Sequence, residues 1–429
     1  MNPTGVEEPA TERPAAPRLE ALRGPETVAA AGLAVAAMAA NVVAVAFTVI
    51  FTRILGADRY GSLAALLNLT IVLLVPGSAL QVAAAREGSV GRLGRGRELS
   101  ATLHRWTRQL LGVLLLVGIA SALAREQLAA LLNIRQEWAA AAVPATGALW
   151  MLLSIERGLL QAARAYRTVG LSVVLEALGR LAVGLALVGA LGVTGAYLGT
   201  LFAIAITAAV LRVVLRRRLG LPAPRSARHP LRELLRDAAI PITVLTLVAA
   251  VQNVDVIVAR HVLTEHTAGV YAAAVVAAKA LVWIAVGLGM WVVPEAARNA
   301  AAGRDPRPVL GRALALIGAI AAVALTFYAV IPGLVLEIAF GKEYRSADSV
   351  LLALGAAYAL LAVTYLAAQF LLGLRKRAFA WLLALAAVLE PILLIAGADD
   401  LPSFAAVVLA VQAATALALL ALAFRPRGP

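Results

Sequence analysis

The apolar residues of this chain fall into long blocks separated by short polar stretches, without the alternation that is typical of strands. A helix needs about 20 apolar residues to cross the hydrocarbon core of a bilayer, where its backbone groups must bond to one another. The blocks therefore predict twelve membrane-spanning helices, near residues 28–51, 62–83, 109–124, 138–161, 168–190, 193–215, 238–259, 267–293, 309–331, 347–372, 378–397 and 402–424.

The composition agrees with this pattern, since 62% of the residues are hydrophobic and only 14% are charged. Soluble domains average roughly 45–50% apolar and about 25% charged residues. A soluble core could not bury so much apolar surface, whereas lipid can act as its solvent. The expected fold is an all-α polytopic membrane protein.

The basic residues predict how the chain is oriented, because loops on the cytoplasmic side carry an excess of lysine and arginine. With the N-terminus inside, the inner loops hold arginine clusters within residues 86–108, 157–167, 212–236, 298–312 and 375–377. The outer loops hold only Arg53, Arg59, Arg125, Arg135, Arg260, Lys342 and Arg345. Both termini are therefore expected in the cytoplasm, with the protein in the plasma membrane.

The central basic loop divides the chain into two equal halves with six predicted helices each. An even number of helices per half makes the halves parallel repeats, related by an axis along the membrane normal. Ile54 through Gly61 also resembles Val262 through Tyr271 at the matching point of the second half. We expect a disordered cytoplasmic tail, a first bundle, a basic cytoplasmic linker, a second bundle and a short tail, at residues 1–27, 28–215, 216–237, 238–424 and 425–429.

Several kinds of site are not expected in this chain. It has no cysteine, which excludes disulfides, thiolate metal sites and a cysteine nucleophile. Its four histidines fall in predicted loops or at helix ends, so neither a metal site within the membrane nor a cofactor is predicted. The net charge of +14 follows the inner loops, so the predicted partners are anionic membrane lipids rather than nucleic acid. The arginines of 86–108 and 212–236 are also expected to collect an anionic lipid carrier.

Three short segments resemble one family of transporters. They are Thr52 through Gly61, Asn253-Val254-Asp255 followed by Gly269-Val270-Tyr271, and Phe340 through Tyr344. Their order and spacing on twelve helices are similar to those of the polysaccharide flippases, within the multidrug/oligosaccharidyl-lipid/polysaccharide exporter superfamily.

The resemblance implies two six-helix bundles around a central cavity that opens alternately to the two sides. It implies that the substrate is a polyprenyl-pyrophosphate-linked oligosaccharide, moved from the inner to the outer leaflet. A polysaccharide polymerase and glycosyltransferases are then expected partners.

Charged residues inside predicted membrane helices are the candidate site residues, because a charge there usually faces a wet cavity or a partner. Arg180 and Lys279 are candidate ligands for a substrate phosphate. The guanidinium donors of Arg180 match the geometry of phosphate oxygens, and Lys279 supplies a second positive charge. Glu176 lies four residues before Arg180, so the two side chains share one helix face. Either the two charges neutralise each other, or Glu176 holds Arg180 in place for the substrate. Lys279 either binds pyrophosphate or pairs across helices with Asp255 or Glu390.

Glu176, Asp255 and Glu390 are candidates for ion coupling or gating, and Arg53 is a third candidate for substrate binding. Asp255 lies beside Asn253 and either binds a proton or sodium ion or is an interfacial acid near Arg260. Glu390 precedes Pro391, which kinks a helix, so it marks either a gate or a structural bend. Arg53 lies at the outer end of the first helix, where it either extends to the interface or has a role in substrate binding or in a gate.

Two other functions fit parts of the pattern. A cation-coupled multidrug exporter of the same superfamily is the main alternative, although Arg180 and Lys279 add positive charge to the expected cavity. A membrane polysaccharide polymerase or ligase is disfavoured, because the predicted outer loops are short and gather no acid–base pair. We therefore do not expect an enzyme.

Overall fold

The computed structural model describes residues 25–221, 230–374, 376 and 378–425, and these form helices without any strand. The predicted all-α fold is confirmed. The helices are α1 (Pro25–Ser89), α2 (Arg97–Leu123), α3 (Arg125–Leu131), α4 (Glu137–Ala162), α5 (Tyr166–Leu219), α6 (Leu231–Val262), α7 (Glu265–Ala278), α8 (Ala280–Ala301), α9 (Arg307–Val330), α10 (Pro332–Phe340), α11 (Asp348–Gly373), α12 (Ala380–Gly397) and α13 (Leu401–Phe424), with a short 3-10 helix at Lys342–Ala347.

Ten segments of the described chain are long and apolar enough to cross a membrane. Two of them, Val35–Ser89 and Tyr166–Leu219, have 55 and 54 residues, more than twice the length that one crossing needs. Each reverses at a glycine with positive φ, Gly56 at 70° and Gly192 at 57°. A side chain is strained in that conformation, whereas glycine adopts it freely. With these two counted as double crossings, the ten segments give the twelve that the hydropathy pattern predicts.

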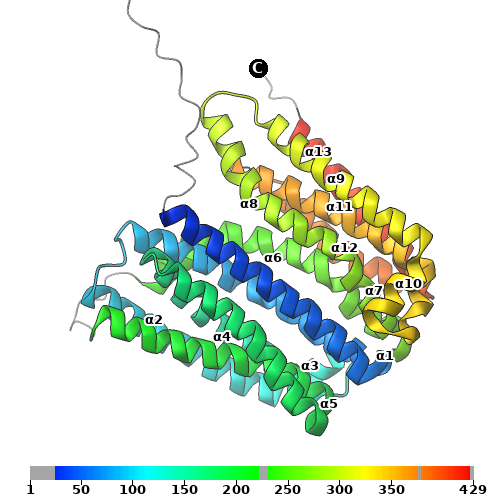
Figure 1. The fold of residues 1–429 in the computed structure, drawn as a ribbon, viewed down its shortest axis with the longest axis horizontal. Coiled ribbons are helices and arrows are strands. Elements are labelled where there is room, and N and C mark those ends of the chain that lie inside the picture. The colour runs from blue at the N-terminus through cyan, green and yellow to red at the C-terminus, as the bar shows by residue number, and fades with distance from the viewer. Residues whose placement is uncertain (1–24, 222–229, 375, 377, 426–429) are drawn as a thin grey trace, which may run out of the picture.

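The helices form two bundles, as expected. We call α1–α5 the N-lobe and α6–α13 the C-lobe. Figure 1 shows α2, α4 and α5 on one side of the molecule and α9, α11 and α13 on the other, with α1 and α6 between them. Within the N-lobe α1 packs on α4 and α5, and within the C-lobe α11 packs on α8, α9 and α13. The lobes meet mainly where α1 lies against α6 and α7.

The expected tails and linker lie largely outside the described residues. These are 1–24 of the N-terminal tail, 222–229 of the linker and 426–429 of the C-terminal tail. The described parts correct the boundaries. Helix α1 already begins at Pro25, while α5 continues to Leu219 and α6 begins at Leu231, so both ends of the expected linker are helical.

The two lobes touch backbone to backbone at one end, close to the turn at Gly56. A Cβ atom added to Gly269 of α7 would lie 1.8 Å from the carbonyl oxygen of Ala57, and one added to Gly61 would lie 3.1 Å from the Gly269 nitrogen. Only glycine allows so close an approach of two helices. The two segments that resemble each other in sequence, around Gly61 and Gly269, thus pack face to face.

Polar contacts join the lobes at this same end, which we call the joined end (residues 52–61, 131–135, 260–271 and 338–344). Arg53 Nη2 donates to the carbonyl of Ile338 at 2.9 Å, and the Tyr344 hydroxyl donates to the carbonyl of Thr52 at 3.0 Å. Asn133 and Arg260 exchange hydrogen bonds between side chains and backbone carbonyls. His266 Nδ1 lies 3.0 Å from an Asp58 oxygen. The arginine distribution predicts that this end is the outer one.

Candidate functional site

A cavity of about 200 Å³ lies between the two lobes. Helices α1 and α5 of the N-lobe and α6, α7 and α8 of the C-lobe supply its walls. Its polar and charged lining residues are Thr48, Tyr60, Asn68, Thr70, Arg180, Thr200, Gln252, Asn253, Lys279 and Trp283. The structure thus brings two of the predicted substrate ligands, Arg180 and Lys279, to one cavity from opposite lobes.

Lys279 occupies the junction of α7 and α8, where the helix is interrupted for one residue. Its ammonium group donates hydrogen bonds to the side-chain oxygens of Asn68, at 2.6 Å, and Asn253, at 3.0 Å. It also lies 5.7 Å from the ring centroid of Tyr358. A buried ammonium ion needs such acceptors to offset its lost hydration. Because Asn68 belongs to α1, this lysine bonds across the cavity to the other lobe.

Two buried carboxylates lie behind Lys279 in the C-lobe and interact with it electrostatically. Asp255 of α6 accepts hydrogen bonds on Oδ2 from the hydroxyls of Tyr271, at 2.6 Å, and Tyr358, at 2.7 Å. Its Oδ1 has no hydrogen-bond partner among the described residues. Glu390 of α12 accepts from Gln412 Nε2 at 3.3 Å. Neutral side chains therefore supply the hydrogen bonds to both acids, while Lys279 is the cation that interacts with them.

Arg180 of α5 lies against the N-lobe side of the cavity. Its guanidinium carbon is 5.2 Å from the ring centroid of Phe47, and its Nε has no hydrogen-bond partner among the described residues. Glu176 interacts with Arg180 electrostatically, but the described contacts include no ion pair between them. Instead Glu176 accepts from Arg157 Nη2 of α4 at 3.2 Å, and Arg157 also donates to Ser172. The Glu176 carboxylate, four residues before Arg180 on the same helix, is therefore held by Arg157 of α4.

The remaining predicted site residue, Arg53, does not line this cavity. It is exposed at the joined end and bonds the C-lobe backbone there. The residues that sequence reasoning missed are Tyr271, Tyr358 and Gln412, which hold the two buried acids. The sequence alone gives little reason to select them as site residues, since polar side chains such as tyrosine and glutamine commonly bond one membrane helix to another. Among the described residues no group of three histidine or acidic side chains could hold a metal ion.

Comparisons with known proteins support the fold. No protein-family model and no curated protein matches the sequence. The structure is similar to one described as the inward-facing conformation of a multidrug resistance MATE family transporter of the MOP superfamily. The two sequences are 12% identical, the match covers 90% of this chain and 93% of that chain, and the TM-score is 0.74.

Two other solved structures show the same likeness. The MATE multidrug transporter DinF-BH, solved as a complex, has 14% identity, covers 97% of this chain and 99% of its own, and gives a TM-score of 0.65. Another is a MOP superfamily transporter from Pyrococcus furiosus that is described as having a binding pocket of reverse polarity. It has 14% identity, the match covers 96% of this chain and 98% of that chain, and the TM-score is 0.57. These values show a MATE-like fold of two bundles, and they do not single out the polysaccharide flippases.

Proposed function

We propose that this protein is a cation-coupled transporter that exports small amphiphilic molecules by alternating access of the N-lobe and the C-lobe. The observation that carries the proposal is the cavity between the lobes, with Arg180 on one wall and Lys279 bonded across it from the other. The solved proteins of similar fold are described as transporters. A multi-pass membrane protein of this architecture suits transport rather than an enzymatic reaction.

The packing of the lobes supports an inward-facing resting state. The joined end, which is predicted to be outside, is held by the glycine contact of Gly61 and Gly269 and by polar bonds. The likeness to the inward-facing MATE structure agrees with this assignment. Export would require the joined end to separate and the opposite ends of the lobes to approach each other.

The buried acids provide a means of coupling. Binding of a proton or sodium ion at Asp255 or Glu390 would remove negative charge that now stabilises the Lys279 ammonium group. Lys279 would then hold Asn68 less firmly or exchange it for another partner. Because Asn68 is on the opposite lobe, the ion would change the contact between lobes, as alternating access requires.

The charge of the cavity indicates the class of substrate. Arg180 and Lys279 are its charged lining residues among those described, and neither acid reaches the lining. A basic cavity favours neutral or anionic amphiphiles over cations. The volume of about 200 Å³ is below the roughly 300–1,000 Å³ of sites for drug-sized ligands, so the cavity must widen to admit a substrate.

The same two cations favour a second candidate, a flippase for polyprenyl-pyrophosphate-linked oligosaccharides. Arg180 and Lys279 would contact the pyrophosphate, the sugars would occupy the widened cavity, and the prenyl chain would stay in lipid. This function would place the protein beside a polysaccharide polymerase and glycosyltransferases.

One transport experiment separates these candidates. Purified protein in proteoliposomes is given an anionic dye, a cationic dye or a fluorescent polyprenyl-pyrophosphate oligosaccharide, under proton or sodium gradients. We expect gradient-dependent movement of the anionic dye, lost in Arg180→Ala and Lys279→Ala but kept in Arg217→Ala, an exposed arginine outside the cavity. Movement of the oligosaccharide alone would establish the flippase. No movement of any of the three would refute both candidates.

A further inference from the structure

A second pocket, with three basic side chains in its lining, lies away from the inter-lobe cavity, at the end of the N-lobe opposite the joined end. It has a volume of about 260 Å³ and forms where the last turns of α5 pass the first turns of α2. Arg212 and Arg216 of α5 and His104 of α2 line it. The arginine distribution predicts that this end of the lobe faces the cytoplasm.

The local backbone fixes the shape of the pocket. Helix α5 ends at Leu219, and the next residue, Gly220, has a φ of 75°, which glycine adopts without strain. Ser100 Oγ donates to the Gly220 carbonyl at 2.9 Å, and Arg97 Nε donates to the Leu221 carbonyl at 3.3 Å. These bonds hold the end of α5 against the start of α2, so the pocket is a built feature of the N-lobe.

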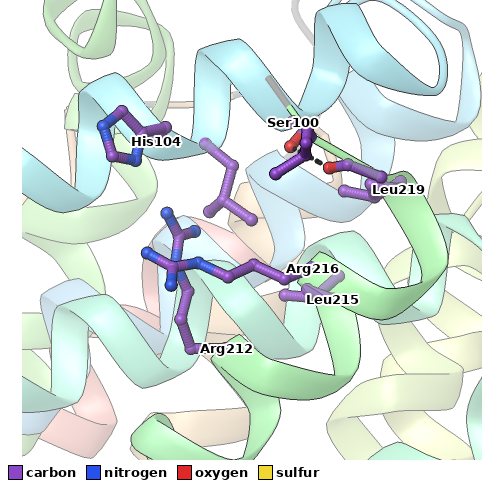
Figure 2. Close-up of a pocket in the computed structure, with 9 residues that line it drawn as sticks. Ser100, His104, Arg212, Leu215, Arg216 and Leu219 are labelled. Carbon is purple, nitrogen blue, oxygen red and sulfur yellow. Dashed lines mark hydrogen bonds between the residues drawn. The ribbon is translucent and has the colours of Figure 1, made fainter.

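The two arginines direct their charged ends into the same space. Figure 2 shows the side chains of Arg212 and Arg216 reaching toward one region, with the His104 ring facing it from α2. The arginines are four residues apart, so they share one helix face and repel each other. A bound anion would relieve that repulsion.

Arg212 has hydrogen-bonding capacity that the protein does not use. Its Nε and Nη1 atoms are buried and, among the described residues, have no hydrogen-bond partner. Glu156 of α4 interacts with Arg212 electrostatically, yet neither of its carboxylate oxygens accepts a hydrogen bond from a described residue. Because Nε and Nη1 have almost no accessible surface, a ligand in the pocket would meet the other donors of Arg212, the guanidinium group of Arg216 and the His104 ring.

We propose that this pocket binds a phosphate group at the predicted cytoplasmic face of the N-lobe. Two guanidinium groups and an imidazole can surround phosphate oxygens with several donors, and none of the described residues that line the pocket is acidic. The rest of the wall is apolar and includes Leu103, Leu215 and Leu219. Such a wall suits the glycerol and acyl portion of an anionic phospholipid, while the same donors also fit a soluble phosphate ester. The site is separate from the transport cavity and does not depend on the proposed function.

The test uses full-length protein in detergent micelles and measures the dissociation constant of acyl-labelled phosphatidylglycerol. Arg216→Glu should weaken binding roughly tenfold or more, because it removes charged donors and adds a repulsive carboxylate. Arg217→Glu is the matched control, since Arg217 is exposed on the same turn outside the pocket. We expect that control to stay within about twofold of wild type. Arg216 is itself exposed, and unchanged thermal unfolding of both variants would show that they fold.

Competition identifies the source of the phosphate. Phosphatidylcholine, inorganic phosphate and glycerol 3-phosphate are added to the labelled complex. Displacement by none of them assigns the pocket to anionic lipid, whereas displacement by either soluble phosphate assigns it to a phosphate ester from the cytoplasm. Equal effects of Arg216→Glu and Arg217→Glu would overturn the proposal, as would equal binding of phosphatidylcholine and phosphatidylglycerol.

Discussion

Lys279 of the C-lobe donates a hydrogen bond of 2.6 Å to Asn68 of the N-lobe, across the cavity that separates the lobes. Both side chains are buried, and 211 positions separate them in the sequence. The bond therefore connects the two bodies that would move relative to each other in the proposed alternating access. It also connects the N-lobe to the acids of the C-lobe, since Lys279 interacts with both Asp255 and Glu390.

Asn68→Ala is expected to shift the protein away from the state described here. A hydrogen bond to a charged group contributes about 1.5–3 kcal/mol, so its loss should change the ratio of the two states roughly tenfold or more. The measurement is the distance between spin labels at Arg59→Cys and Lys342→Cys, which lie on different lobes at the joined end. The chain has no native cysteine, so these labels are specific.

Asn41→Ala is the control for that experiment, because Asn41 lies on the same helix α1 but is exposed. It removes an identical side chain without removing a bond between lobes. If both variants gave the wild-type distance distribution, Lys279 and Asn68 would not determine which state is populated.

Gly269→Ala is expected to prevent the joined end from closing. The added Cβ would overlap the backbone carbonyl of Ala57, which cannot rotate away as a side chain could. We expect longer distances between the same spin labels and impaired transport. Gly287→Ala is the control, since its Cβ would meet nothing within 4 Å and alanine favours a helix. A wild-type distance in Gly269→Ala would show that the helices can separate locally at little cost.

The crossings and halves are predictable because lipid requires long apolar helices with internally bonded backbones. The hydropathy pattern therefore predicts two helices at 28–51 and 62–83, although they continue through Gly56 as parts of α1. Residue number alone cannot predict which neighbour each charge faces. Glu176 is one helical turn from Arg180, yet its side chain lies nearer Arg157, which is 19 positions away.

The site is predictable only in part, for the same reason. A charge in a membrane helix is conspicuous, so the sequence identifies Arg180, Lys279, Asp255 and Glu390 directly. Tyr271 and Tyr358 come from α7 and α11, and their common partner Asp255 becomes evident only when three helices are packed. Arg53 is equally conspicuous in the sequence, but it bonds to the C-lobe at the joined end instead of lining the cavity. Its position along the helix does not reveal that contact.

Glu176→Gln is expected to destabilise the N-lobe strongly. Arg157 is buried and Glu176 is part-buried, with side-chain exposures of 3% and 12%, so removing the acid leaves the buried charge of Arg157 without its partner. Such losses cost about 3–5 kcal/mol, whereas breaking a pair at the surface costs about 0–1 kcal/mol. Glu126→Gln is the matched control, since Glu126 pairs with Arg125 while 67% exposed. Thermal unfolding in detergent should show a large decrease in Tm for the first variant only.

Asp255→Asn is expected to uncouple transport from the ion gradient while the protein still folds. The amide oxygen can still accept from Tyr271 and Tyr358, so the local packing is retained, but the group no longer binds a proton or balances Lys279. Substrate movement should then become independent of the gradient or stop. Tyr358→Phe removes one of the two hydroxyl donors and keeps the carboxylate, so it should shift the ion dependence without abolishing it. Gradient-dependent uptake in proteoliposomes checks both variants, and full ion dependence in Asp255→Asn would assign the coupling to Glu390 instead.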